Sequence, residues 1–375
     1  MHMNRAVKFV FTGGHHNAAL EVLRRIKEMK PDASFLWLGH RHTSLKNKSD
    51  SVEYREVIAA SIPFVDLKAG KFFHVYNIIH LLRIPYGFFQ ALYHLIKFRP
   101  NIIVSFGGYL AAPVVLAGWA LGIPSVVQEQ TSVAGIANRF AGRFATKVFI
   151  TWAASEKYFP KGKTVLTGLP LRKAIFERNQ EMFKFRDRLP TIYITGGKQG
   201  SHVINTAIAG RLADLLGVAN VIHQTGANTE TRDNEMLSQA REALPEKLRE
   251  RYVIKDFVYE NEIGSVFGVS DIIISRAGAH IIYEILACGK PSILVPIPWS
   301  SHNEQLSNAK IIESMGLGKV LEQKDLNADA LFAAVSDMVK NIADYKKNAE
   351  KAKGEIVMDA ADKIAEEIIK IVTNK

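Results

Sequence analysis

The stretch from Ser270 to Lys310 constrains the fold of this chain more than any other part. It reads as a buried strand at Asp271–Ser275, a turn of small residues, a helix, a second strand at Pro291–Pro296 and another helix. Short apolar runs between turns are typical of strands that are covered on both faces, as in a parallel sheet. Such sheets bind ligands beyond the carboxyl ends of their strands, where helix N-termini offer unpaired N–H groups. The stretch therefore predicts an α/β fold with a ligand site at the turn.

The same order of strand, glycine turn and helix recurs along the chain. It begins at Ala6–Phe11 with Gly13 and Gly14, and it restarts at Thr191–Thr195 after a linker at Gly168-Leu169-Pro170. Further strands are expected at Phe35–Leu38, Tyr54–Ile58, Asn101–Phe106, Pro124–Gln128, Phe144–Ile150, Thr164–Leu166, Val221–Gln224 and Tyr252–Phe257, and terminal helices at Ala328–Ile371. The repetition predicts two doubly wound, Rossmann-like α/β domains facing a cleft, residues 1–168 and 169–354.

Composition narrows the function classes. A chain of 375 residues suits two domains, and 47% hydrophobic with 23% charged residues is typical of a globular enzyme. The single cysteine, Cys288, excludes a disulfide framework and a cysteine-based metal site. Neither a signal peptide nor a membrane-spanning run is expected. The net charge of +11 favours an anionic partner, and we find no nucleic-acid-binding motif, so nucleic acid is not the expected partner.

The segment 68–100 differs in kind from the rest. Its apolar residues recur at helical spacing and are interrupted at Pro85-Tyr86-Gly87, which predicts two helices. The apolar residues are Phe72, Phe73, Tyr76, Ile79, Leu82, Ile84, Phe88, Phe89, Leu92 and Ile96, and the flanking basic residues are Lys68, Lys71, Arg83, Lys97 and Arg99. Two interpretations stay open. The helices belong to the core, or part of their surface rests on an anionic membrane.

Six motifs follow one another in an order that is more specific than any one of them. They are Gly13-Gly14-His15, Gly107-Gly108-Tyr109, Glu129-Gln130 with Asn138, Gly196-Gly197-Lys198-Gln199-Gly200, Ser275-Arg276-Ala277-Gly278-Ala279 with Glu284, and Gln305 with Asn308-Ala309. Together, over nearly the whole chain, they resemble the MurG family. These are peripheral membrane glycosyltransferases that add N-acetylglucosamine to lipid I to give lipid II in peptidoglycan synthesis.

The resemblance implies a GT-B fold and a reaction. The C-terminal domain would bind UDP-N-acetylglucosamine, and the N-terminal domain would bind a polyprenyl-diphosphate-linked acceptor at the cytoplasmic face of the cell membrane. A C-terminal helix at about 355–375 would pack back on the first domain. The reaction would be an inverting displacement by the C4 hydroxyl of the muramyl sugar, with no metal and no cofactor.

The resemblance also implies roles for particular residues. On the donor side, basic groups and helix N-termini would stabilise the departing diphosphate: Arg172, Lys198, Gln199, Gly200, Gly278 and Ala279. Glu284 would hold the ribose, the backbone at Val258 would read the uracil, and Gln305 with Glu304 would contact sugar hydroxyls. On the acceptor side, His15 would be the general base. The acceptor or the cleft would be lined by Gly13, Gly14, Tyr109, Glu129, Thr131 and Asn138.

Other interpretations of the same residues remain open. His15 could cap a helix, and Glu284 could be an ordinary exposed helix residue. Departures from the family pattern are a shortened glycine run after Phe11-Thr12, Thr131 in place of asparagine, Lys198 in place of serine and Ile281 in place of threonine. The alternative functions are transfer to another lipid such as diacylglycerol, a non-hydrolysing UDP-sugar 2-epimerase, and a non-catalytic membrane-recruiting subunit.

Overall fold

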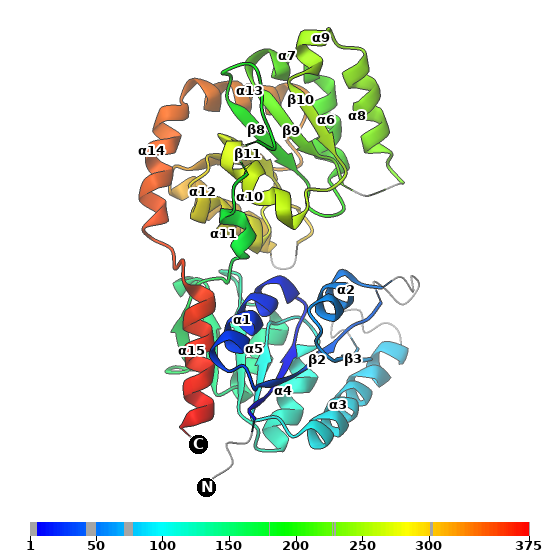
Figure 1. Cartoon of the computed structure of the whole chain (residues 1–375), viewed down its shortest axis with the longest axis vertical. Helices are drawn as coiled ribbons and strands as arrows, with labels where there is room; N and C mark the ends of the chain where they lie inside the picture. Colours follow the sequence, from blue (N-terminus) through cyan, green and yellow to red (C-terminus); the bar gives the residue numbers. More distant parts are fainter. Residues whose placement is uncertain are drawn as a thin grey trace. The chain divides into compact units, whose positions relative to one another are not determined.

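The computed structural model describes residues 6–42, 50–70, 78–179, 181–226, 228, 230–300 and 303–374, with the backbone alone at 78–84. The chain divides into two compact units (Figure 1). The N-terminal unit consists of Met1–Arg172 together with Val357–Lys375, and the C-terminal unit consists of Lys173–Ile356.

The N-terminal unit is built on a parallel sheet of seven strands in the order β3-β2-β1-β4-β5-β6-β7. The strands are β1 (Lys8–Thr12), β2 (Ser34–Gly39), β3 (Phe64–Asp66), β4 (Ile102–Ser105), β5 (Ser125–Glu129), β6 (Lys147–Ile150) and β7 (Thr164–Leu166). All residues of β4 and β5 are buried, which explains their unbroken apolar character. Stacked rings of Phe11, Trp37 and Phe106 fill the core beside the central strands.

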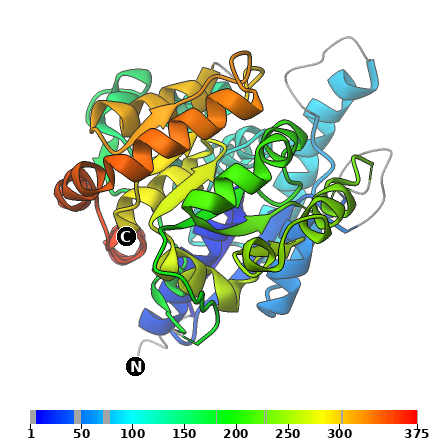
Figure 2. The same cartoon turned by 90° about the horizontal axis from the view of Figure 1, so that it is seen from above.

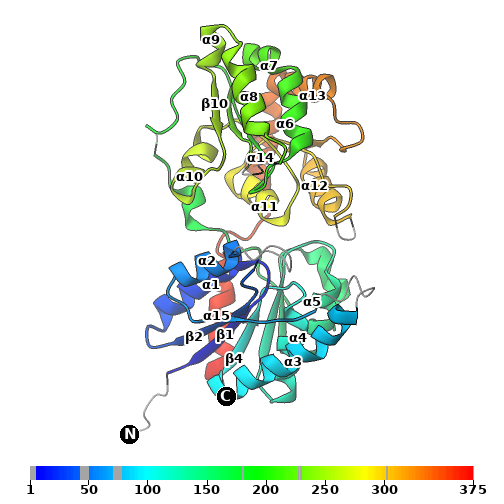
Figure 3. The same ribbon diagram turned by 90° about the vertical axis from the view of Figure 1, so that its right-hand side faces the viewer.

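Helices cover both faces of this sheet (Figure 3). On one face lie α1 (His16–Met29), α2 (Val52–Ala59) and the C-terminal α15 (Ala360–Thr373), and on the other lie α3 (Ile78–Phe98), α4 (Ala111–Ala120) and α5 (Ile136–Phe144). A short 3-10 helix, η1, spans Ala153–Tyr158. The C-terminal helix α15 packs against α1, buries Ile364 and Ile368, and pairs Glu367 with Lys147 of β6 at 2.5 Å.

The C-terminal unit repeats this plan with six parallel strands in the order β10-β9-β8-β11-β12-β13. They are β8 (Thr191–Thr195), β9 (Asn220–Gln224), β10 (Tyr252–Lys255), β11 (Ile272–Ser275), β12 (Ser292–Leu294) and β13 (Gly318–Val320). The helices are η2 (Lys173–Phe176), α6 (His202–Gly210), α7 (Leu212–Val218), α8 (Asp233–Glu242), α9 (Glu246–Arg249), α10 (Glu260–Val269), α11 (Ala279–Cys288), α12 (Glu304–Ser314), α13 (Ala328–Lys340) and α14 (Ile342–Lys353). Figure 2 shows α13 in orange alongside α6 in green, and these two helices pack together over the sheet.

The prediction of two doubly wound, Rossmann-like α/β units is confirmed. In each sheet the strand order reverses once, between β1 and β4 in the N-terminal unit and between β8 and β11 in the C-terminal unit. The loops that leave neighbouring strands at such a point turn in opposite directions and leave a crevice at the carboxyl edge, where ligands bind. Each unit therefore has one preferred ligand position of its own.

Two expectations about secondary structure are wrong. Tyr54–Ile58 is not a strand but part of helix α2, which begins because the Ser51 hydroxyl accepts a hydrogen bond from Tyr54 N. The segment around Pro85 does not separate two helices, since α3 continues through it. An internal proline costs about 3 kcal/mol, and the complete burial of Ala91 and Leu95 further along the helix offsets that cost. Phe72, Phe73 and Tyr76 lie outside the described residues.

Candidate active site

The glycine turns of the N-terminal unit meet at its switch point. Gly13 follows β1 with a φ of 126°, and a Cβ there would lie 2.6 Å from the carbonyl carbon of Phe106. Gly14 N donates to Gly107 O at 3.2 Å, and Gly107 and Gly108 both have a φ of 76°. Side chains are therefore excluded from the contact between the two turns, which leaves backbone groups at the carboxyl ends of β1 and β4.

His15 occupies the N-cap position of α1, next to these turns. Its side chain makes no capping hydrogen bond, which removes the support for a purely capping role. Desolvation and the neighbouring His16 lower the pKa of His15 to about 4. The His15 residue keeps an exposed surface, so a substrate can reach it. At neutral pH the ring is uncharged and has a nitrogen lone pair that can accept a proton.

Glu129 braces the loop that follows β5 instead of facing solvent. Its side chain is 3% exposed, and its two carboxylate oxygens accept hydrogen bonds from Thr131 N at 2.9 Å, Gly135 N at 3.2 Å and Asn138 Nδ2 at 2.8 Å. Thr131 also donates its hydroxyl to Glu129 at 2.8 Å. Asn138 in turn lies against Gly107, where a Cβ would come within 2.9 Å of Nδ2. Contacts of Glu129 and Asn138 with an acceptor stay a prediction. In the structure, the hydrogen bonds of both side chains stabilise the conformation of the loop after β5.

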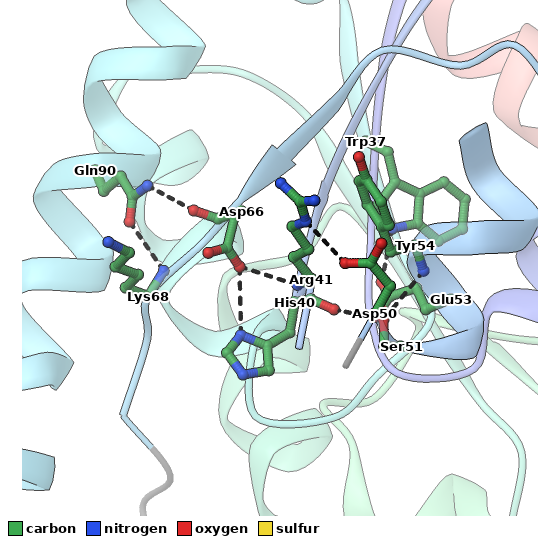
Figure 4. A network of polar contacts seen from close by, with 10 residues as sticks. All are labelled: Trp37, His40, Arg41, Asp50, Ser51, Glu53, Tyr54, Asp66, Lys68 and Gln90. Carbon is green, nitrogen blue, oxygen red and sulfur yellow. Dashed lines mark hydrogen bonds and ion pairs between the residues drawn. The ribbon is translucent and has the colours of Figure 1, made fainter. Parts of the chain in front are cut away.

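A polar network adjoins Tyr109 at the ends of β2 and β3 (Figure 4). Asp66 accepts from Arg41 N at 2.9 Å and lies 3.5 Å from His40 Nδ1, while Gln90 of α3 donates to Asp66 O at 2.8 Å. The His40 ring meets Tyr109 edge to face, with ring centroids 6.4 Å apart. Nearby, Glu53 accepts from Trp37 Nε1 at 2.7 Å, and burial raises the pKa of the Glu53 carboxyl. The network therefore holds the His40 ring against the half-buried Tyr109.

In the C-terminal unit, the loop from Gly196 to Gly200 follows β8 at the switch point. Gly197 and Gly200 have φ values of 85° and 78°, and the turn closes through Gly200 N to Gly197 O at 3.0 Å. A Cβ on Gly200 would lie 1.9 Å from Thr225 O, so only glycine lets the loop pack so closely. Lys198 and Gln199 are exposed at its tip. The loop leads into α6, and together they form an arrangement suited to an anionic group.

The second turn of this unit follows β11 and opens α11. Gln305 holds it in place, since its Oε1 accepts from Ala277 N at 3.2 Å and from Ile297 N at 3.1 Å. Arg276 donates to Val295 O at 3.1 Å, and burial lowers the pKa of its guanidinium to about 10. Gly278 is the N-cap residue of α11 with no side-chain cap. The first turn of α11 therefore begins with backbone N–H groups to which no N-cap side chain is bonded.

The remaining predicted donor residues fall in different surroundings. Glu284 is 4% exposed in α11, so the interpretation as an ordinary exposed helix glutamate is wrong. Val258 is buried just before α10, and Glu304 begins α12. Arg172 is half-buried at the end of the first segment of the N-terminal unit. Ile281, which stands in place of a threonine, is half-buried in the first turn of α11.

Sequence reasoning missed a buried polar chain behind the Gly196–Gly200 loop. Asn205 of α6 donates to Thr225 O at 2.9 Å and to Asp233 at 2.8 Å, and it lies 3.0 Å from His223 Nε2. His223 is fully buried, and desolvation lowers its pKa to about 3. The strand that ends in His223 and Gln224 carried a signal, because polar residues at the carboxyl end of a buried strand need partners.

The described part of the chain holds neither a metal-binding cluster nor a helix that could span a membrane. Within 6–42, 50–70, 78–179, 181–226, 228, 230–300 and 303–374, no group of three or more His, Cys, Asp or Glu side chains is arranged to hold a metal ion. In the same described part of the chain, no helix is both long enough and apolar enough to cross a membrane.

Comparison with protein families shows the class of protein to which the chain belongs. Residues 10–150 match the glycosyltransferase family 28 N-terminal domain, and residues 191–364 match the glycosyltransferase family 28 C-terminal domain. The two domain models cover the two doubly wound sheets in the same order. The fold and the paired glycine turns are thus those of a family 28 glycosyltransferase.

Relatives along the whole chain identify the family. A Bacillus thuringiensis (strain Al Hakam) protein named UDP-N-acetylglucosamine--N-acetylmuramyl-(pentapeptide) pyrophosphoryl-undecaprenol N-acetylglucosamine transferase 2 is 31% identical, covering 96% of this chain and 97% of that protein. A Bacillus cytotoxicus protein with the same name, without the number, is 32% identical and covers 95% of both chains. The chain belongs to this transferase family, whose members are also called MurG.

Solved structures agree on the fold. Acinetobacter baumannii MurG superposes with a TM-score of 0.73 at 22% identity, covering 97% of this chain and 99% of that one. A UDP-GlcNAc 2-epimerase from Neisseria meningitidis, bound to UDP-GlcNAc, superposes with a TM-score of 0.65 at 13% identity, covering 97% and 99%. At these identities the likeness shows the GT-B fold that transferases and epimerases share.

Proposed function

We propose that the protein transfers N-acetylglucosamine from UDP-N-acetylglucosamine to the C4 hydroxyl of the muramyl sugar of lipid I, which gives lipid II for peptidoglycan synthesis. The observation that carries this proposal is family membership over 96% of the chain, since the named relatives bear that substrate pair in their names. The acceptor side is supported by His15 and the two glycine turns, which meet at the switch point of the N-terminal sheet.

The two units would divide the substrates between them. The C-terminal unit, from about 169 to 354, would bind the UDP-sugar, because its Gly196–Gly200 loop and the uncapped start of α11 both offer N–H groups to phosphates. Lys198 would add a point charge to the same diphosphate, in place of the hydroxyl of a serine. The N-terminal unit, from 1 to about 168 with the helix at 355–375, would bind the lipid-linked acceptor through the turns at Gly13 and Gly107.

The remaining donor contacts would orient the nucleoside and the sugar. Glu284 would accept hydrogen bonds from the ribose hydroxyls, as acidic residues do in other nucleotide folds. Its place in α11, the helix whose first turn is assigned to the phosphates, supports this role. Gln305 has its Oε1 engaged by Ala277 and Ile297, which leaves its amide Nε2 to donate to a sugar hydroxyl. Glu304 and Arg172 would complete the contacts to the sugar and the diphosphate.

The transfer itself would be a single inverting displacement. The acceptor O4 loses its proton to the neutral imidazole of His15 and forms a bond to the anomeric carbon of the donor. The bond from that carbon to the β-phosphate oxygen breaks, and UDP departs with the electron pair. The negative charge that develops on the diphosphate is stabilised by backbone N–H groups and Lys198, so no metal is required. The His15 imidazole is unprotonated at neutral pH and can take the proton, and its lowered pKa makes it a weaker base than an ordinary histidine.

The membrane would be met by one face of α3. Four large apolar side chains on this helix are exposed: Tyr86 at 55%, Phe89 at 64%, Tyr93 at 61% and Ile96 at 52%. Their spacing of three and four residues forms one stripe, here called the α3 stripe. The opposite side of the helix, with Ala91 and Leu95, is buried in the core. The core interpretation of the segment 68–100 would therefore apply to one side of α3 and the membrane interpretation to the other.

Charge supports an anionic lipid surface as the partner of the α3 stripe. Lys68, Lys97 and Arg99 are exposed on or beside the helix. Amphipathic helices with aromatic residues and basic neighbours lie in the interface of anionic bilayers. The protein would thus be a peripheral protein of the cytoplasmic face of the cell membrane, where a lipid-linked acceptor is presented.

The test is incubation with UDP-N-acetylglucosamine, with and without lipid I. Release of UDP that requires lipid I supports the transferase. Formation of a C2-epimerised sugar nucleotide or free sugar without an acceptor would instead support the epimerase, the second candidate, which the shared fold favours. Glycosylation of diacylglycerol but not of lipid I would keep the donor half of the proposal and replace the acceptor.

A further inference from the structure

Gln224 joins two parts of the C-terminal unit: the Gly196–Gly200 loop, which the proposed function assigns to the diphosphate, and Val258, which the family resemblance assigns to the uracil. It is the last residue of β9 and is 4% exposed. On one side lies the Gly196–Gly200 loop, and on the other lies Val258 at the start of α10. The Gln224 side chain hydrogen-bonds to both, so it links the two elements directly.

The amide of Gln224 is used at both ends. Its Nε2 donates to Gly197 O at 2.9 Å, and its Oε1 accepts from Val258 N at 3.0 Å. The same Oε1 accepts from the buried hydroxyl of Tyr193 at 3.1 Å. An uncharged amide of this length can donate to one backbone carbonyl and accept from a distant N–H. A carboxylate cannot donate, and an aliphatic side chain can do neither.

The backbone around Gln224 makes the link rigid. Gly226 N donates to Asp256 O at 3.1 Å, and Thr225 N donates to Lys255 O at 2.9 Å, so the ends of β9 and β10 are tied together. Gly200 packs directly on Thr225, where a Cβ would come within 1.9 Å of the carbonyl oxygen. A shift of the Gly197 turn would therefore be felt at Val258, and the Gln224 side chain is the part that can be removed without changing the main chain.

We propose that Gln224 is a positioning residue that couples recognition of the nucleobase at Val258 to binding of the diphosphate at the Gly196–Gly200 loop. The inference rests on the proposed binding of UDP by this unit. The two ends of UDP would then bind cooperatively, because the same buried Gln224 side chain holds in place both the backbone that binds the base and the loop that binds the diphosphate.

The bond from Val258 N also decides which atom of Val258 reads the base. Its N–H is engaged by Gln224, so its carbonyl oxygen is the group that meets the nucleobase. A carbonyl accepts from N3–H of uracil but repels N3 of cytosine, which is an acceptor as well. Gln224 therefore contributes to selectivity for UDP over CDP, because it keeps the Val258 N–H from donating to cytosine.

The experiment compares Gln224→Met with Tyr193→Phe in the full-length chain. Binding of uridine, UDP and CDP is measured by calorimetry, and the melting temperature is measured alongside. Gln224→Met leaves the Gly197 carbonyl and the Val258 N–H without their partner, so UDP affinity should fall about 10- to 100-fold and the preference for UDP over CDP should shrink to roughly threefold or less. Tyr193→Phe removes the hydroxyl that donates to the same Oε1 and keeps both bonds from Gln224 to the backbone, so UDP affinity and selectivity should stay within about threefold of the wild type.

The selectivity ratio separates positioning from a merely structural role. A variant that melts earlier but keeps the wild-type ratio of UDP to CDP affinity and binds UDP as tightly overturns the inference. If Gln224→Met does not fold, Gln224→Glu decides: it keeps the acceptor for Val258 and loses the donor for Gly197, so selectivity should persist while UDP affinity falls. Loss of selectivity or unchanged UDP affinity in that variant contradicts the coupling. A wild-type protein that binds no UDP overturns the proposed function, and this inference falls with it.

Discussion

The α3 stripe leads to a prediction that separates membrane contact from folding. The change is the double substitution Phe89→Ser with Tyr93→Ser, at two side chains that are 64% and 61% exposed. Because these rings already face solvent, their loss should change the free energy of unfolding by no more than about 0.5 kcal/mol each. The residues that hold α3 in the core, Ala91 and Leu95, are untouched.

The expected loss of membrane affinity follows from the area that the rings offer. An aromatic side chain presents about 150–250 Å², so the exposed part of each ring is roughly 100–150 Å². At about 25 cal/mol per Å² this area corresponds to about 2.5–4 kcal/mol per ring on full burial. Insertion to half that depth gives about 3 kcal/mol for the pair, a loss of roughly 100-fold in partitioning.

The assay is co-sedimentation with vesicles that contain anionic lipid. A matched control is Tyr259→Ser, which removes an aromatic ring that is 62% exposed in the C-terminal unit, and it should sediment as the wild type does. Raised salt should also weaken binding of the wild type to the vesicles, since Lys97 and Arg99 contribute about 1 kcal/mol each near an anionic surface. Equal sedimentation of the double variant and the wild type would refute the membrane role of the α3 stripe.

Four further predictions concern single residues of the two units. His15→Ala should lower the turnover rate about 10²- to 10⁴-fold while UDP affinity is kept, and equal losses of both would make His15 structural. Because the pKa of His15 is lowered to about 4, wild-type turnover should not fall with protonation of this base until the pH drops well below 6.5, which a pH–rate profile measures. Glu284→Ala should weaken UDP binding about 10- to 100-fold by calorimetry, and unchanged affinity would remove the ribose role. The lowered pKa of the buried His223 contributes stability that is present above pH 6.5 and is lost as the pH falls toward 3, roughly 5 kcal/mol in all, so melting of His223→Gln should depend less on pH over this window.

The fold could be predicted from the sequence because its signals are local. Buried parallel strands read as short apolar runs, as in Thr191–Thr195, which the structure reproduces residue for residue. Gly13 and Gly200 mark turns that require a positive φ or a close backbone approach, and both do so in the structure. These features depend on a residue and its immediate neighbours along the chain.

Features set by distant packing could not be predicted in this way. Pro85 is tolerated inside α3 because buried residues later in the helix outweigh its cost. Glu129 stood out as a candidate ligand contact, but four donors within ten residues turn its carboxylate inward. Gln224 drew no attention in the sequence, since its role arises only when Gly197 and Val258 meet in space.

The most direct test of the central claim is the mass and anomeric configuration of the product formed from UDP-N-acetylglucosamine and lipid I. The reaction proposed here predicts a lipid that is heavier by one N-acetylhexosamine residue, joined through the muramyl O4 in the β configuration, with one UDP released for each product formed. Lipid I recovered unchanged while the nucleotide sugar is consumed, or a product with the α configuration, would contradict it.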